Sequence, residues 1–264
     1  MPNGFEHVVL NWKKRPYDHN DWMLGDFISP SQRRRAASVT KLDWDVSKIL
    51  DQGSTPHCVG YAWAGFGICA PVVQPWGNEM GEKIYYQAKI EDGEPQQENG
   101  SSTLSGVKAY MHFGALENNG YAWARNLDDI LVQLFTKGPV VCGSYWYYDM
   151  FNWDADGTVH VGGDIAGGHE YYIYGADRDA QQLHFVNSWG TAFGIGGKFK
   201  MGFSDFQYIF NDGGDAVSAV EVAPEPTPEP TPDPTPTPEP GGCLAAVLGV
   251  DRKLTRLMKH FHVK

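Results

Sequence analysis

Residues 51–66 read DQGSTPHCVGYAWAGF, and most of what the sequence predicts starts from this stretch. Cys58 lies six residues after Gln52 and begins an apolar run in which a buried helix is expected. Pro56 precedes it in a turn, where a missing amide donor is tolerated at a helix start. A helix N-terminus stabilises a thiolate and lowers its pKa. The stretch therefore predicts a reactive cysteine.

Two downstream segments supply chemical partners for this thiol. GGHEYYIYGAD contains His169, and VNSWGTAFGIGGKF contains Asn187. An imidazole can take the proton of a thiol and pass it to a leaving amine. An asparagine amide can hold that ring in position. Gln52 can direct its amide donor at a developing oxyanion. The predicted catalytic set is Cys58 as nucleophile, His169 as acid and base, Asn187 as orienter and Gln52 as oxyanion donor.

Composition excludes several classes of partner. The 264 residues are 42% hydrophobic and 20% charged, which is typical of a soluble folded protein. The net charge of -11 argues against a nucleic-acid partner, because such binders carry basic surfaces. No apolar run reaches the roughly 18 residues of a membrane span, and the N-terminus lacks the apolar core of a signal peptide. We expect a cytoplasmic location, or association with an intracellular or viral assembly.

The cysteines argue against a metal site. They are scattered, with no CxxC pair, at positions 58, 69, 142 and 243. Zinc sites use closely spaced ligand pairs, so we expect no metal and no cofactor. Without a secretory signal, reduced thiols are the favoured interpretation. A Cys69–Cys142 disulfide stays open as an alternative.

Four segments are predicted along the chain. Residues 1–44 form a lead-in packed on a catalytic domain at 45–222. Residues 223–240 carry proline at nearly every second position, so they are expected to form an extended polyproline II linker. Residues 241–264 follow as a basic, amphipathic tail with apolar residues near a helical period.

Three interpretations of the tail remain. The first is a docking peptide that tethers the chain to a partner or assembly, because a spacer leading to a short amphipathic segment has the arrangement of a tether. The second, ranked well below it, is a helix on a membrane surface. The third is a frayed end.

The residue pattern of the sequence changes near residue 125. Helices are expected at 58–70, 82–92 and 101–115, whereas the later sequence has short β-branched and aromatic runs separated by Gly and Asp. A helical half at about 45–125 followed by a β half at about 126–222 predicts an α+β fold. The halves are expected to meet at a cleft.

Several of these motifs together resemble the papain-like cysteine peptidases. DQGSTPHC resembles the family's QGxCGSCW block and keeps its six-residue spacing from Gln to Cys. GGHEYYIYGAD resembles its NHAVxxVGY block, and NSWG at 187–190 is the family motif itself. GPVVCGSYW resembles a strand of the family, and WKKRPYDHNDW resembles the lead-in of bacterial and phage members. The resemblance covers nearly all of residues 8–222.

The resemblance implies a papain-like fold with a helical left half, a β-barrel-like right half and the active-site cleft between them. It implies a cysteine endopeptidase that hydrolyses peptide bonds through a Cys58 thioester, with peptides or proteins as substrates. Trp189 would shield the contact between Asn187 and His169 from water. Contacts to the substrate are expected from Gly100, Ser101, His57, Gly168 and Trp189.

The chain departs from the family pattern at a few positions. Thr55 replaces a structural cysteine, Pro56-His57 replaces Gly-Ser, and Glu170 replaces a small residue. The lead-in is also shorter than the family's inhibitory propeptide, so either there is no zymogen or inhibition comes from elsewhere. Two other functions therefore stay open: a catalytically silent papain-like module for binding or assembly, and a cysteine amidase acting on cell-wall peptides.

Overall fold

Helix α2 (Cys58–Gly67) lies at the centre of the molecule, and every one of its residues is buried. Its apolar and small side chains explain both the burial and the close packing of its neighbours. The backbone of α3 (Asn78–Glu91) approaches Gly60 so closely that a Cβ there would overlap the carbonyl oxygen of Gly81. Helix α4 (Thr103–His112) packs alongside, and the Ser102 side chain caps it by accepting from the Ser105 amide.

The structure is a computed structural model that describes residues 4–5, 7–15, 18–113 and 119–221. The linker at 223–240 and the tail at 241–264 lie outside the described residues, as does Cys243. The boundaries predicted for these segments therefore stay predictions.

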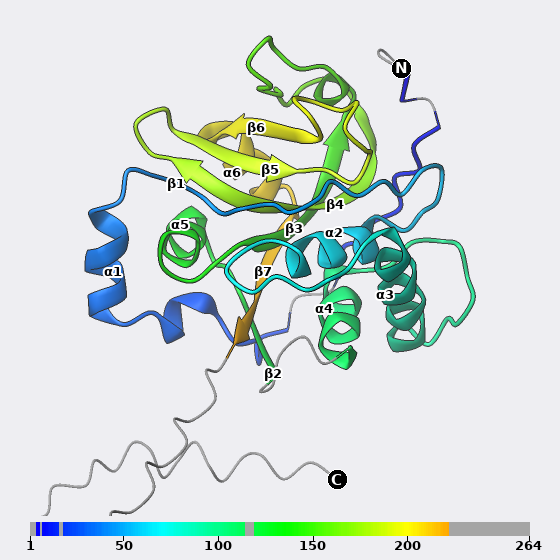
Figure 1. Cartoon of the computed structure of the whole chain (residues 1–264), viewed down its shortest axis with the longest axis horizontal. Helices are drawn as coiled ribbons and strands as arrows, with labels where there is room; N and C mark the ends of the chain where they lie inside the picture. The colour runs from blue at the N-terminus through cyan, green and yellow to red at the C-terminus, as the bar shows by residue number, and fades with distance from the viewer. Residues whose placement is uncertain (1–3, 6, 16–17, 114–118, 222–264) are drawn as a thin grey trace, which may run out of the picture. The chain divides into compact units, whose positions relative to one another are not determined.

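The strands form one antiparallel sheet in the order β2-β7-β3-β4-β5-β6, with β1 paired to β4 (Figure 1). The strands are β1 (Lys41–Asp43), β2 (Asn119–Trp123), β3 (Val140–Tyr147), β4 (Ile165–Asp177), β5 (Gln182–Val186), β6 (Lys198–Gly202) and β7 (Asp215–Glu221). The remaining helices are η2 (Leu24–Phe27), α1 (Pro30–Ala37), α5 (Leu127–Thr136), η3 (Tyr148–Phe151) and α6 (Phe203–Asn211).

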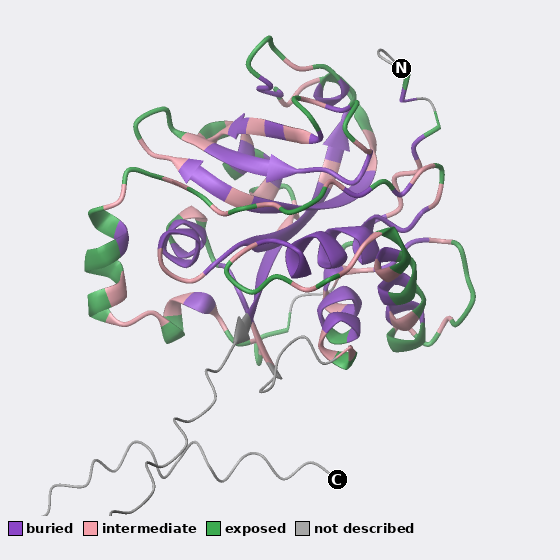
Figure 2. Cartoon of the chain, in the orientation of Figure 1, coloured by how far each residue is buried: buried purple, intermediate pink, exposed green. Residues whose placement is uncertain are grey.

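Strand β4 separates two hydrophobic clusters. Side chains alternate along a strand, so Tyr171 and Ile173 pack into a cluster with α5, β5 and β6, whereas Tyr172 packs against α2 on the other side. The buried core follows β4 and α2 in Figure 2, and the exposed residues lie on the outer helices and loops.

The α+β prediction is confirmed, with one difference in detail. Helices α5 and α6 lie within the half at 126–222 that was expected to be β-rich. Helix α5 carries an amphipathic pattern and an Asn126 cap that accepts from the Asp129 amide, so its helical signal was present in the sequence. The sheet also draws β1 and β2 from the first half of the chain.

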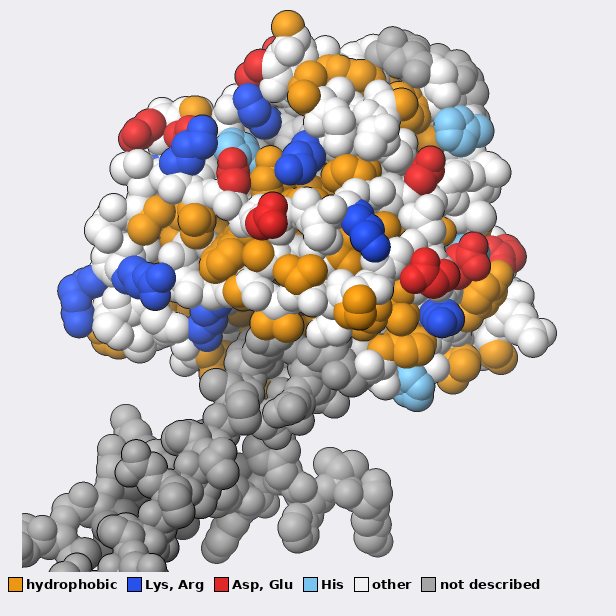
Figure 3. All heavy atoms as spheres, in the orientation of Figure 1, with side chains coloured by type: hydrophobic (Ala, Val, Ile, Leu, Met, Phe, Trp, Pro, Cys, Tyr) orange, Lys and Arg blue, Asp and Glu red, His pale blue; other side chains and the backbone are white. Residues whose placement is uncertain are grey.

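The outer surface is mixed in character. Acidic, basic and hydrophobic side chains are interspersed on the face shown in Figure 3. No helix within the described ranges combines the length and the apolar character needed to cross a membrane.

The contact between α2 and α3 predicts the effect of a single methyl group. Gly60→Ala should lower the free energy of unfolding by about 1–3 kcal/mol, because the new Cβ meets rigid backbone of α3. Gly202→Ala is the control, since a Cβ there meets only Ser204 Oγ, at 3.8 Å. Urea unfolding followed by circular dichroism measures both. Equal stability of the two variants would contradict this packing.

Candidate active site

Cys58 is the first residue of α2 and is fully buried. Its thiol faces the backbone amides of Glu170, Val59 and Asn11, which favour the thiolate. The amide of Val59 belongs to the helix start, as the sequence predicted, whereas those of Glu170 and Asn11 come from β4 and from the N-terminal region.

His169 and Asn187 are joined by a hydrogen bond of 2.8 Å between Nε2 and Oδ1. His169 lies on β4, and Asn187 directly follows β5. The indole of Trp189 stacks on the imidazole, with ring centroids 4.6 Å apart. The second ring nitrogen, Nδ1, is buried and has no hydrogen-bond partner among the described residues. The ring is thus held through Nε2, and Nδ1 remains for proton transfer.

Gln52 is buried and is bonded to the loop that carries Asn187. Its Oε1 accepts from Ser188 Oγ at 2.7 Å, and its backbone amide donates to the Ser188 carbonyl at 2.8 Å. Its Nε2 donates to the Thr55 carbonyl at 2.8 Å, which uses one of the two amide hydrogens. The structure therefore fixes the Gln52 amide between Ser188, which follows Asn187, and the turn before Cys58.

Burial determines the protonation states of Cys58 and His169. The pKa of Cys58 is raised to about 12 by burial and then by the charge of Glu170, which together outweigh the three amides. Burial lowers the pKa of His169 to about 4, although its bond to Asn187 favours the charged ring. Both groups are neutral at neutral pH in this conformation. The lowered thiol pKa predicted from the helix start is wrong for this state, because the site excludes water.

The segment at residues 8–15, called the covering segment below, contributes to the burial of the site. It runs in extended form across the site and bonds to both sides. The Trp12 amide donates to the Gly168 carbonyl at 2.8 Å, and the Lys13 amide donates to the Ser101 carbonyl at 2.8 Å. Gly168 and Ser101, predicted to contact substrate, thus contact the covering segment.

Glycines make this close approach possible. A Cβ at Gly100 would overlap the Asn11 carbonyl, and Gly100 also has a φ of +78° that side chains disfavour. A Cβ at Gly168 would overlap the Trp12 carbonyl, and one at Gly167 would lie 2.5 Å from Leu10 Cβ. The floor beneath the covering segment is therefore shaped for an extended peptide backbone.

The side chains of His57 and Glu170 contact other residues than Cys58 and His169. His57 is buried, lies 2.6 Å from the Glu98 carboxylate through Nε2, and stacks on Tyr85 with centroids 3.9 Å apart. Glu170 follows His169 on β4, so its side chain leaves the strand on the opposite face. There it lies 3.0 Å from Thr103 Oγ1.

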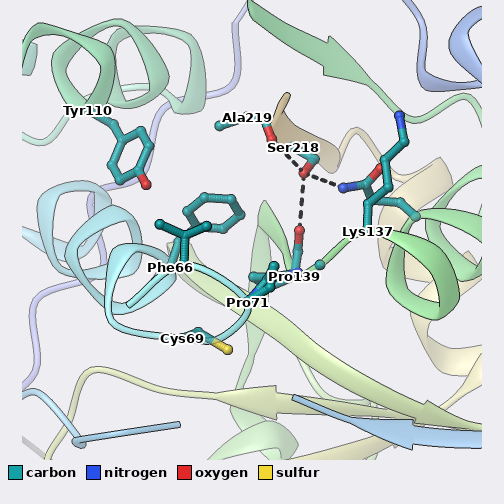
Figure 4. Close-up of a pocket in the computed structure, with 11 residues that line it drawn as sticks. Phe66, Cys69, Pro71, Tyr110, Lys137, Pro139, Ser218 and Ala219 are labelled. Atoms are coloured by element: carbon teal, nitrogen blue, oxygen red, sulfur yellow. Dashed lines mark hydrogen bonds between the residues drawn. The ribbon is translucent and has the colours of Figure 1, made fainter. Parts of the chain in front are cut away.

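A separate cavity of about 250 Å³ is lined by residues other than the candidate catalytic set. Figure 4 shows Phe66 and Tyr110 on one side of it and Ser218, held by hydrogen bonds, on another. Burial lowers the pKa of Lys137 at this cavity. Cys69, which also lines it, is a free thiol, as are Cys58 and Cys142, so the alternative Cys69–Cys142 disulfide is not formed.

Comparison with known proteins supports the family suggested by the sequence. The fold is papain-like: xylellain, a cysteine protease from Xylella fastidiosa, superimposes with a TM-score of 0.66 and 18% identity, covering 82% of this chain and 97% of xylellain. Cathepsin B-like cysteine proteinase 5 of Caenorhabditis elegans is 29% identical over 92 residues, 34% of this chain and 26% of that protein. Cathepsin B-like cysteine proteinase 3 of Ostertagia ostertagi is 26% identical over 140 residues, 51% of this chain and 79% of that protein.

No family model matches the chain. The match spans about a quarter of the length of the Caenorhabditis protein. The fold and the sequence similarities together support the papain-like cysteine protease family.

Sequence reasoning missed the contribution of the covering segment. Asn11 and Trp12 lie in a stretch that resembles a family lead-in, but no periodicity shows where an extended segment will lie. The run VVLNW is apolar and precedes basic residues, which was the one available signal of a buried strand-like segment. Trp12 is indeed buried.

The burial of Cys58 predicts slow alkylation. Iodoacetamide should modify Cys58 in the full chain at least about tenfold more slowly than in Gly167→Ala, because the new methyl group displaces Leu10 and opens the site. Peptide mass spectrometry over a time course measures the rate. Gly202→Ala serves as the control and should label like the parent chain. Fast labelling of Cys58 in the parent chain would contradict the closed arrangement.

Proposed function

We propose that the chain is a cysteine endopeptidase that hydrolyses peptide bonds through a Cys58 acyl-enzyme. The observation that carries the proposal is the 2.8 Å hydrogen bond between His169 and Asn187, with the Trp189 ring stacked on the imidazole. His169 lies on β4, the strand whose Glu170 amide faces the Cys58 thiol. A structural histidine needs neither a buried unpartnered Nδ1 nor a helix-start thiol that faces the backbone amide of the next residue on its strand.

In the proposed reaction, Cys58 and His169 act once in forming the thioester and once in its hydrolysis. His169 Nδ1 takes the proton of Cys58 as Sγ bonds to the peptide carbonyl carbon. The oxyanion forms beside the Cys58 backbone amide and the Gln52 amide. The imidazolium then gives its proton to the leaving amine as the C–N bond breaks. Water, deprotonated by His169, cleaves the thioester and returns the thiol.

We also propose that the covering segment keeps this site inactive until it is displaced. It holds the amide-binding positions that an extended substrate needs, at the carbonyls of Gly168 and Ser101. It also keeps the thiol and the imidazole in their neutral forms by burial. Water that enters after displacement removes most of the desolvation cost, so an ion pair between Cys58 and His169 becomes accessible.

Hydrolysis of casein tests the catalytic assignment. Gly167→Ala should cleave casein faster than the parent chain. In that background Cys58→Ala and His169→Ala should abolish cleavage, and Gln52→Ala should lower kcat by about 10²–10³-fold. Thermal unfolding of each variant separates lost chemistry from lost folding.

Parallel incubation with purified peptidoglycan distinguishes the other functions. Release of cell-wall peptides without casein cleavage would assign an amidase. Folded Gly167→Ala that cleaves neither substrate, and whose Cys58 resists a thiol-directed epoxide, would assign a silent module.

The sequence supports a further proposal for residues 241–264, as a docking segment that tethers the enzyme to a partner within a cytoplasmic, intracellular or viral assembly. Deletion of 241–264 should leave casein cleavage unchanged while the enzyme no longer sediments with that assembly. Loss of cleavage would show instead that these residues support the catalytic unit.

A further inference from the structure

The Trp12 side chain of the covering segment is inserted among residues of three elements. Its Nε1 donates to Thr103 Oγ1 at 2.8 Å. Its ring lies where a Cβ of Gly143 would be and comes within 3.0 Å of the position of a Cβ at Gly168. Trp12 is 4% exposed. We call this place, bounded by Thr103, Gly143 and Gly168, the Trp12 seat. It lies next to the backbone positions that hold the covering segment in extended form.

Two carboxyl groups lie at the inner end of the Trp12 seat. Thr103 Oγ1 is 3.0 Å from Glu170 Oε2 and 2.7 Å from Asp215 Oδ1. Glu170 is fully buried. Its Oε1 and the Oδ2 of Asp215 are buried atoms without a hydrogen-bond partner among the described residues. The indole of Trp63 faces Glu170 without reaching hydrogen-bond geometry.

A count of the available hydrogens shows that Glu170 and Asp215 cannot both be carboxylates with a hydrogen-bond donor at Thr103. Thr103 has one hydroxyl hydrogen, and it already accepts from Trp12. It can donate to only one acid, so the other must itself donate a proton to Thr103. Burial raises the pKa of Glu170 well above its ordinary value and that of Asp215 to about 6. Glu170 is therefore the protonated member.

The cations that face Asp215 belong to the covering segment. Arg15 and Lys14 act to lower the pKa of Asp215, and Arg15 also pairs with Asp21. The other titratable groups that face the two acids are Cys58, Cys142 and Tyr171. When the covering segment leaves, Trp12 and both cations leave together, and two acids remain at the end of an empty seat.

We propose that the Trp12 seat is the pocket that selects the substrate, and that it takes an arginine or lysine side chain. This rests on the proposed peptidase function. A guanidinium has five N–H donors in a planar fork, enough to serve Oε1 of Glu170, Oδ2 of Asp215 and Thr103 together. The guanidinium charge favours ionisation of the acids, and the charge-assisted bonds offset their burial. Trp12 occupies the seat with a single donor and leaves those two oxygens unserved.

The first experiment tests the seat within the full chain and needs no catalysis. Trp12→Arg and Trp12→Leu are compared by urea unfolding between about pH 4 and pH 8. A guanidinium in the seat lowers the pKa of both acids, so its stabilisation is present at high pH and lost as the pH falls through their folded values. Trp12→Arg should therefore gain stability over Trp12→Leu as the pH rises.

In the parent chain, the stability contributed by Asp215 changes with pH in the opposite direction. Because the Asp215 pKa is raised to about 6, its contribution to stability is full below about pH 3.9 and is lost as the pH rises through 6. Adding Asp215→Asn to Trp12→Arg should abolish most of the gain, whereas Asp128→Asn, at an exposed carboxylate, should leave it. A Trp12→Arg chain no more stable than Trp12→Leu at pH 8 would overturn the proposal.

The second experiment reads selectivity. Gly167→Ala is given fluorogenic peptides in which each of the four residues before the scissile bond is varied. One position should prefer Arg or Lys over Leu and Gln by at least about tenfold, which corresponds to about 1.4 kcal/mol. Asp215→Asn should reduce that ratio, and Asp128→Asn should not. Hydrolysis without a basic preference would overturn the pocket assignment. Absence of any hydrolysis would overturn the peptidase proposal, and the unfolding comparison would then decide the seat alone.

Discussion

Strand β4 is the constraint on which the rest of the site depends. Three consecutive residues of β4 serve the site, and the side chain of the middle one leaves the strand on the face opposite to that of its two neighbours. The Gly168 carbonyl holds the covering segment, His169 turns to Asn187 and Trp189, and Glu170 turns to Thr103. The antiparallel register with β3 sets Ser144 opposite His169 and Gly143 opposite Glu170, which leaves room beside the acid. A one-residue slip would exchange the base and the acid.

Water access decides the chemistry that this geometry performs. A helix start and three facing amides favour a thiolate, yet burial and a nearby carboxyl group dominate while the covering segment is present. The same burial keeps the imidazole neutral. In this account, inhibition needs no distortion of the catalytic residues, because displacement of one extended segment changes their solvation and frees their backbone partners together.

The sequence predicted those parts of the site whose signals are local. Cys58, His169 and Asn187 lie in short motifs, and the apolar pattern after Cys58 indicated the buried helix that the structure contains. The contact of Thr103 with the acids Glu170 and Asp215 was not predicted. Thr103 and Asp215 are 112 positions apart and meet only through the packing of α4 on the sheet. The covering segment was missed for a similar reason: its extended backbone is held by glycines in other segments, such as Gly100 and Gly168. Glu170 stood out in the sequence as an unusual neighbour of the base, but its direction became clear only from the strand.

The protonation state of His169 tests the central claim most directly, which is that the covering segment holds the catalytic pair neutral. Histidine-labelled protein can be titrated by ¹⁵N NMR, because the imidazole nitrogen shifts report charge and tautomer. In the parent chain His169 should stay neutral down to about pH 4, with its proton on Nε2 bonded to Asn187. In Gly167→Ala its pKa should rise, as water and the Cys58 thiolate come to favour the charged ring. A charged His169 near neutral pH in the parent chain, or identical titrations in both chains, would contradict the account.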